Sequence, residues 1–173
     1  MFHRPDGRRR PSGEREQILQ AESSRCLRNP FHWLRNYVWI QDPKATEAEL
    51  RVLPLIPWPG QKRLIRFLLT GYLQSRRRLV NKAREIGATW LAVALIYWLW
   101  LSTPRFYALL GSRKEKLVDD RTPMSLFGKL RFIHETQPEW LRPETEDVQL
   151  RFVNLVRCTP KVGQCEPCHF VVS

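Results

Sequence analysis

An uninterrupted apolar and aromatic stretch, residues 90–101, constrains the fold of this chain more than any other segment. It is well short of the roughly 20 residues that a helix needs to span a bilayer, so we expect a buried core helix and no membrane role. Pro104 follows the stretch and predicts the end of the helix. With 173 residues, the chain is long enough to build one core around it.

The segment before this helix has the outline of a phosphate-binding loop. When it is aligned with the pattern G-x-x-x-x-G-K-[ST], Gly87 and Thr89 match the second glycine and the hydroxyl residue. Ala88 stands where the lysine is usual. Lys82 takes the place of the first glycine, with Arg84 two residues later. Because such a loop curls around the anion, a lysine at its start can still reach the β- and γ-phosphates.

The flanks of this loop predict a strand, helix, strand unit. We expect residues 79–80 to form a short buried strand and residues 105–111 to form the next strand. Such units cross over right-handed and build parallel sheets covered by helices. The sequence therefore predicts an α/β fold of the P-loop NTPase type, a parallel sheet flanked by helices. A basic turn before a buried helix is the alternative interpretation of the loop.

A second motif lies upstream, where Trp-Pro-Gly-Gln ends at Gln61 and an amphipathic helix begins. A glutamine amide offers a donor and an acceptor together, which is what the edge of adenine requires. Apolar residues of that helix would dock it on the sheet and hold Gln61 near the loop: Leu64, Ile65, Leu68 and Tyr72. A plain helix-start glutamine is the alternative, but together with the loop the motif predicts an ATP site.

These motifs resemble the N-terminal ATPase domain of the large terminase subunit of tailed bacteriophages and prophages. The resemblance spans about residues 26–154 and rests, in family order, on residues 29–34, 58–61, 82–90, 111–115 and 138–143. It implies a domain that hydrolyses ATP to drive double-stranded DNA into an empty capsid. In this family a separate C-terminal nuclease domain cuts the DNA.

The resemblance also implies a role for each matched residue. Gln61 would bind adenine, while Lys82 and Arg84 would hold phosphates. Gly87 would permit the close turn, and Thr89 would ligand the Mg²⁺ that accompanies ATP. The implied partners are double-stranded DNA, the terminase small subunit and the portal, and homo-oligomers are expected only of the full-length family protein.

Hydrolysis requires one carboxylate that holds Mg²⁺ and another that orients the attacking water. In the family these belong to a Walker B strand that lies beyond the last residue of this sequence. The acidic pairs Asp119–Asp120 and Glu146–Asp147 do not follow apolar strands, so we expect both pairs to be surface charges on a helix and a turn. We therefore expect ATP binding without turnover by this chain alone, and we assign no catalytic residue.

Composition divides the chain into three segments. Residues 1–25 are expected to form a disordered basic arm, 26–154 the terminase-like domain, and 155–173 an out-of-pattern tail that a shift of reading frame after about residue 154 explains. Residues 165–169 of the tail spell the C-x-x-C-H haem-attachment pattern, and Cys158 is a possible further zinc ligand. Haem attachment requires export, but the sequence shows no apolar signal-peptide core. A zinc site would need a second paired knuckle, which the sequence does not show nearby.

Local signals place the remaining elements. Asn29 and Pro30 predict the start of a helix through Ile40, a strand is expected near residues 53–56, and residues 148–153 are expected to start a strand without a partner. Ser112 and Ser125 are expected to cap two further helices. The tryptophans of the predicted helices are expected in the core rather than in a base-stacking platform: Trp33, Trp39, Trp90, Trp98 and Trp100.

A net charge of +12 and a pI near 10.2 favour a polyanionic partner. The alternative function is therefore a standalone basic nucleic-acid-binding protein with no nucleotide site, in which Lys82 and Arg84 contact DNA phosphates. A remnant too incomplete to fold stably is the third possibility. Few cysteines outside the tail and no signal sequence predict a reducing compartment, the cytoplasm of a host cell.

Overall fold

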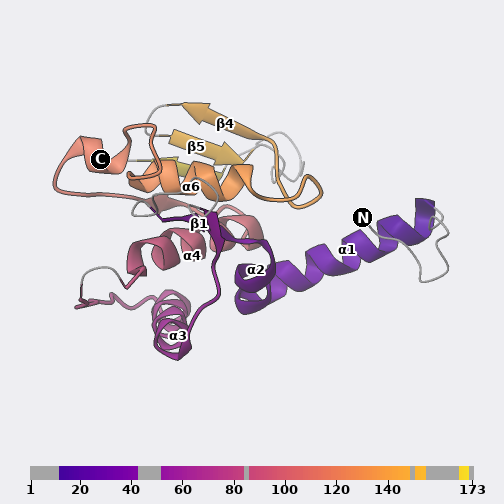
Figure 1. Ribbon diagram of the computed structural model, residues 1–173, viewed down its shortest axis with the longest axis horizontal. Helices are drawn as coiled ribbons and strands as arrows, with labels where there is room; N and C mark the ends of the chain where they lie inside the picture. Colours follow the sequence, from indigo (N-terminus) through magenta and orange to yellow (C-terminus); the bar gives the residue numbers. More distant parts are fainter. Residues whose placement is uncertain (1–11, 43–51, 84–85, 149–150, 155–167, 172–173) are drawn as a thin grey trace.

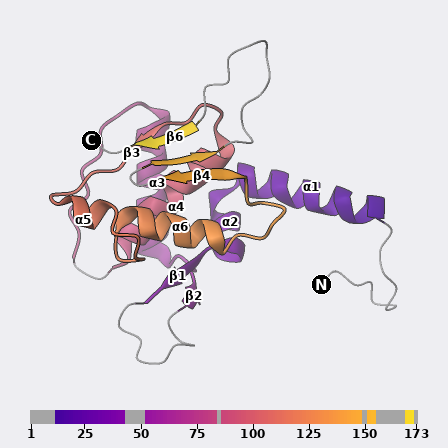
Figure 2. The same cartoon turned by 90° about the horizontal axis from the view of Figure 1, so that it is seen from above.

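The computed structural model describes residues 12–42, 52–83, 86–148, 151–154 and 168–171. These residues form helices and two small sheets, which Figures 1 and 2 show from two directions. In chain order the elements are α1 (Ser12–Arg28), α2 (Pro30–Tyr37), β1 (Trp39–Gln41), β2 (Val52–Pro54), α3 (Pro59–Leu73), α4 (Ala88–Ser102), β3 (Ala108–Leu109), α5 (Glu115–Val118), α6 (Leu126–Glu135), β4 (Thr145–Val148), β5 (Arg151–Asn154) and β6 (Cys168–Val171).

Helix α4 is the centre of the core, as its apolar sequence predicts. It contacts α1, α2, α3 and α6, and Figure 1 shows it between α3 and α6. Most of its side chains are buried, and the buried ones lie all around the helix, as expected of a helix without a polar face. Among the described residues, no helix is both long and apolar enough to cross a membrane.

The larger sheet has the strand order β3, β6, β5, β4. Strand β3 pairs parallel with β6, whereas β6 with β5 and β5 with β4 are antiparallel. The strand predicted within residues 105–111 is confirmed in β3, although it is shorter. The prediction that the strand near residues 148–153 has no partner is wrong, because β5 is paired on both edges. A P-loop sheet is not seen among the described strands, and that fold stays a prediction.

The predicted buried strand at residues 79–80 is wrong. Both residues lie in an irregular segment, and Leu79 is 91% exposed. Two apolar residues between Arg78 and Asn81 offer too little apolar surface to offset the burial of their charged and polar neighbours. The segment therefore runs along the surface between α3 and α4.

The prediction of a disordered arm over residues 1–25 is wrong for residues 12–25, which are helical and belong to α1. Residues 1–11 lie outside the described part of the chain. Glu14 in the first turn and Arg25 and Arg28 in the last turn complement the helix dipole. Figure 1 shows α1 extending away from the body, with its C-terminal end next to α2.

Helix α2 begins as predicted and ends early. The Asn29 side chain accepts hydrogen bonds from the backbone N–H groups of Phe31 (3.0 Å) and His32 (3.2 Å), which confirms the predicted cap. The helix ends at Tyr37 rather than at Ile40, because β1 pairs antiparallel with β2. Strand β2 lies close to the predicted position but ends at Pro54.

The caps of the later helices give a mixed result. Ser125 caps α6 as predicted, its hydroxyl accepting from the N–H of Gly128 at 3.1 Å. The prediction for Ser112 is wrong, because α5 begins after Lys114.

The tryptophans lie mostly in the core. Trp33, Trp90 and Trp100 are buried, as predicted, and Trp33 stacks on Tyr97 with 5.8 Å between ring centroids. Trp98 is half-buried, and its indole N–H donates to the backbone oxygen of Cys26 at 2.9 Å. Trp39 is 39% exposed, so its predicted burial is wrong.

Asp119 is buried, so the prediction that it is a surface charge is wrong. Arg131 of α6 donates to both Asp119 oxygens, at 2.7 and 2.9 Å, and its Nε donates to Asp147 of β4 at 2.7 Å. This network joins the segment after α5 to α6 and to the sheet. Asp119 and Asp147 are 12 and 16 residues away from Arg131 in the sequence, so no local sequence pattern predicts the network.

We expect Asp119→Asn to lower the free energy of unfolding by about 3 kcal/mol, because it leaves the buried Arg131 guanidinium without one of its two carboxylates. Urea denaturation followed by circular dichroism measures the change. Glu139→Gln, which removes an exposed carboxylate, is the matched control and should change the free energy of unfolding by less than about 0.5 kcal/mol. Equal effects of both substitutions would contradict this account.

His134 of α6 gives the fold a dependence on pH. Its Nδ1 lies 2.9 Å from the Tyr97 hydroxyl, and its ring packs on Trp100 and Phe152. Burial and the nearby Arg142 charge lower the pKa of His134 to about 4, while Asp147 opposes the shift. The unfolded chain therefore binds the proton more tightly than the folded chain between pH 6.5 and about 4.

We expect the free energy of unfolding to fall by about 1–2 kcal/mol between pH 7 and pH 5. Stability is lost as the pH falls, because His134 is protonated in the unfolded chain at pH values at which it is still neutral in the folded chain. Urea denaturation at both pH values measures the change, and His134→Gln should remove most of this slope whatever its effect at pH 7. An unchanged slope in the variant would overturn the assignment to His134.

Candidate nucleotide-binding cleft

A cleft of about 530 Å³ lies at the N-terminal end of α4. Its walls come from β1, β2, the start of α4, the start of α6 and the irregular segment around Lys82. The volume is within the range of small-molecule sites. Three residues of the predicted ATP site share this lining: Lys82, Gly87 and Thr89.

Gly87 turns the chain into α4. It is the N-cap of this helix, with φ 71° and ψ 10°, in the left-handed region that glycine adopts most readily. A Cβ at this position would also lie 3.3 Å from the Gln61 amide nitrogen. The local conformation thus favours the glycine of the loop pattern.

The first turn of α4, which borders the cleft, carries backbone N–H groups that come before the helical hydrogen-bond ladder. The first helical hydrogen bond runs from the N–H of Leu91 to the oxygen of Gly87, so the three preceding N–H groups come before the helical ladder. Ala88, Thr89 and Trp90, which carry them, all line the cleft. Together with the helix dipole, these groups favour an anion at this end of α4.

Of the two residues predicted to hold phosphates, Lys82 lines the cleft and Arg84 cannot be placed. Lys82 is exposed and lines the cleft together with the first residues of α4. Arg84 lies outside the described residues.

Gln61 lies against the loop, as predicted, but both ends of its amide have protein partners. The nitrogen donates to the backbone oxygen of Ile86 at 3.1 Å. The oxygen accepts from the backbone N–H of Trp58, the N-cap residue of α3, at 3.2 Å. Gln61 therefore stands behind Gly87, and it does not belong to the described residues that line the cleft.

Lys129 is a cleft residue that sequence analysis missed. Its ammonium group donates to the backbone oxygens of Pro123 (2.8 Å) and Met124 (2.6 Å) and lies 5.3 Å from the centroid of the Trp90 ring. Burial lowers its pKa. It is a lysine in the first half of an ordinary amphipathic helix, so the sequence carries no signal of its place.

The electrostatic character of the cleft is mixed but mainly positive. Lys82 and Lys129 are the basic residues of the lining, and Asp42 is its acidic residue. The carboxylate and the hydroxyl of Thr89 are oxygen donors of the kind that Mg²⁺ prefers. The cleft therefore offers cations and backbone N–H groups for an anion, and oxygen ligands for a hard cation that accompanies it.

Gly87→Ala should destabilise the fold by about 1–2 kcal/mol, because alanine is strained in the left-handed conformation. Thermal and urea denaturation measure the effect. Gly111→Ala is the matched control, because nothing lies within 4 Å of the Cβ that it would add. If Gly87→Ala were no more destabilising than Gly111→Ala, the turn at Gly87 would not have the conformation described.

Comparisons with known proteins add no family assignment. No protein-family model matches this chain, and no curated protein matches it. The resemblance to the terminase ATPase domain thus rests on the sequence motifs alone.

Proposed function

We propose that this chain binds ATP with Mg²⁺ in the cleft at the start of α4, as the N-terminal part of the DNA-packaging motor of a tailed phage or prophage. One observation carries the proposal: Lys82, Gly87 and Thr89 line the same cleft. Gly87, in a left-handed conformation, is the N-cap at which α4 begins beside that cleft. A phosphate-binding loop likewise gathers a lysine, a glycine turn and a hydroxyl residue at the start of a helix. The support is limited to this part of the pattern, since residues 79–80 before the loop are not a strand.

The first turn of α4 and three side chains of the cleft have defined roles in this proposal. The N–H groups of the first turn of α4 bind phosphate oxygens, and Lys82 neutralises the β- and γ-phosphates. Thr89 ligands Mg²⁺, which takes oxygen ligands from the protein and from the phosphates together. Lys129 adds a second cation that the motif does not include.

The role of Gln61 at adenine is conditional on a local change. Its amide would have to leave Ile86 or Trp58 to face the base, since both of its hydrogen-bonding ends are in use. In the structure as described, Gln61 supports the loop from behind.

We propose binding without efficient hydrolysis by this chain. Hydrolysis needs one carboxylate for Mg²⁺ and another to orient water. Among the described residues, Asp42 is the carboxylate in the lining of the cleft, while Asp119 is paired with Arg131 inside the protein. The proposal extends to double-stranded DNA, the small subunit and the portal as partners, and to the host cytoplasm as the location.

Lys82→Ala should weaken ATP·Mg²⁺ binding at least about tenfold, because it removes a charge-assisted contact to phosphate. Titration calorimetry or a fluorescent ATP analogue measures the dissociation constant. Lys116→Ala, on the exposed surface of α5 outside the cleft, is the matched control and should change nothing. Steady-state phosphate release should stay at background, and release well above background that Lys82→Ala abolishes would contradict the proposal of binding without turnover.

A second candidate function is favoured by the exposed basic residues of and after α3: Lys62, Arg63, Arg66, Arg76 and Arg77. In this alternative the chain binds nucleic acid only, and Lys82 contacts DNA phosphates. The same variant separates the two. The alternative is supported if ATP·Mg²⁺ neither binds nor displaces DNA and Lys82→Ala only reduces the salt dependence of DNA binding.

A further inference from the structure

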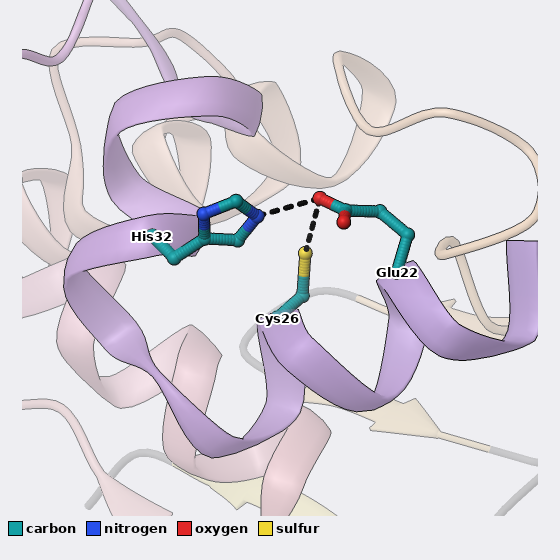
Figure 3. Close-up of side chains that lie close together, drawn as sticks. All are labelled: Glu22, Cys26 and His32. Carbon is teal, nitrogen blue, oxygen red and sulfur yellow. Dashed lines mark hydrogen bonds and ion pairs between the residues drawn. The ribbon is translucent and has the colours of Figure 1, made fainter. Parts of the chain in front are cut away.

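Three side chains with metal-binding chemistry meet where α1 turns into α2. Glu22 and Cys26 are four residues apart on α1, so they lie on the same face of that helix. His32 comes from the first turn of α2, which the Asn29 cap holds against the end of α1. Figure 3 shows the three side chains pointing toward one another.

The three potential ligand atoms form a compact group. A carboxylate oxygen of Glu22 lies 2.5 Å from Nε2 of His32 and 3.9 Å from Sγ of Cys26. All three ligand atoms lie within 4.8 Å of one another. In a tetrahedral zinc site, bond lengths of about 2.0–2.3 Å place neighbouring ligand atoms about 3.3–3.6 Å apart. Side-chain shifts of about 1 Å would therefore bring the three atoms around one ion.

Burial and access also suit a metal ion. Cys26 is buried, while the side chains of His32 and Glu22 keep 15% and 25% of their exposure. The thiol is thus the most buried of the three ligands, and the imidazole and the carboxylate are closer to solvent. In the proposed site, solvent on that side would supply water as the fourth ligand.

We propose that Glu22, Cys26 and His32 form a zinc site that fastens α1 to α2. A thiolate, an imidazole and a carboxylate are the ligands that Zn²⁺ takes in proteins, with water in the fourth position of a tetrahedron. The cysteine sulfur disfavours Mg²⁺ and Ca²⁺, which prefer sites made of oxygen. The site is separate from the cleft and involves none of its residues.

Neighbouring groups hold the ligands in place. The hydroxyl of Tyr37 donates to the Glu22 carboxylate at 2.9 Å, and the Asn36 side chain lies 3.3 Å from Nδ1 of His32. Such second contacts orient a ligating carboxylate and imidazole. When Zn²⁺ binds, the Cys26 thiol releases its proton to solvent, and Nε2 of His32 binds the ion in place of its hydrogen bond with Glu22.

The position of the site gives the metal a structural role. Helix α1 extends away from the body, and its C-terminal end is the part that the other elements hold, through contacts such as that of Trp98 with the Cys26 backbone. A bond from Cys26 and Glu22 to His32 through Zn²⁺ would add a link at that end. The metal would set the direction in which α1 leaves the body.

The test uses the full chain with Zn²⁺ and with Co²⁺ as a spectroscopic probe. We expect one Zn²⁺ per chain after dialysis, a higher Tm with Zn²⁺, and a thiolate-to-cobalt charge-transfer band in the near ultraviolet. Cysteines of the tail are removed in the reference protein, so that a thiolate signal reports on Cys26: Cys158→Ser, Cys165→Ser and Cys168→Ser. In that reference, Cys26→Ser should abolish the band, and His32→Gln should weaken Zn²⁺ binding at least about tenfold.

Controls make each outcome decisive. Glu16→Gln removes an exposed carboxylate from α1, away from the turn between α1 and α2, and should leave Zn²⁺ binding unchanged. If Cys26→Ser fails to fold by circular dichroism, Glu22→Gln and His32→Gln, which keep the buried cysteine, decide the question. The proposal is overturned if the reference protein binds no Zn²⁺, if Co²⁺ gives no thiolate band, or if the ligand variants bind as well as Glu16→Gln.

Discussion

The burial of α4 is the constraint on which the rest of the structure depends. A helix without a polar face must be covered on all sides, and the surrounding elements provide that cover with aromatic contacts. Trp33 of α2 stacks on Tyr97, Phe132 of α6 packs against Trp90, and Phe152 of β5 packs against Trp100. These contacts leave the N-terminal end of α4 at the surface, where its first N–H groups border the cleft.

The cleft is assembled from segments that are distant along the chain. The start of α4 supplies N–H groups and Thr89, the segment before it supplies Lys82, and α6 supplies Lys129. The hydrogen bonds of the Lys129 ammonium group to the carbonyls of Pro123 and Met124 hold that charge in the wall of the cleft. The proposed ATP site therefore depends on the packing of α6 on α4 as much as on the loop motif.

The proposed zinc site belongs to another part of the same framework. Cys26 is close to Trp98, near the C-terminal end of α4, whereas the cleft lies at its N-terminal end. The two sites can thus be tested independently, because neither shares a side chain with the other. The buried pairing of Arg131 with Asp119 and Asp147 fastens α6 to the sheet and supports the wall of the cleft that carries Lys129.

Local chemistry in the sequence determined the buried helix α4, the caps at Asn29 and Ser125 and the turn at Gly87, since each depends on neighbours within a few residues or on a long apolar run. Only the tertiary structure decided the elements whose partners are distant: the end of α2 at β1, the two neighbours of β5, and the burial of Asp119. The sequence placed Lys82, Gly87 and Thr89 in one site because they share one loop. It could not show Lys129 in that cleft or the meeting of Glu22 and Cys26 with His32, because these contacts require helices to pack or a chain turn to close.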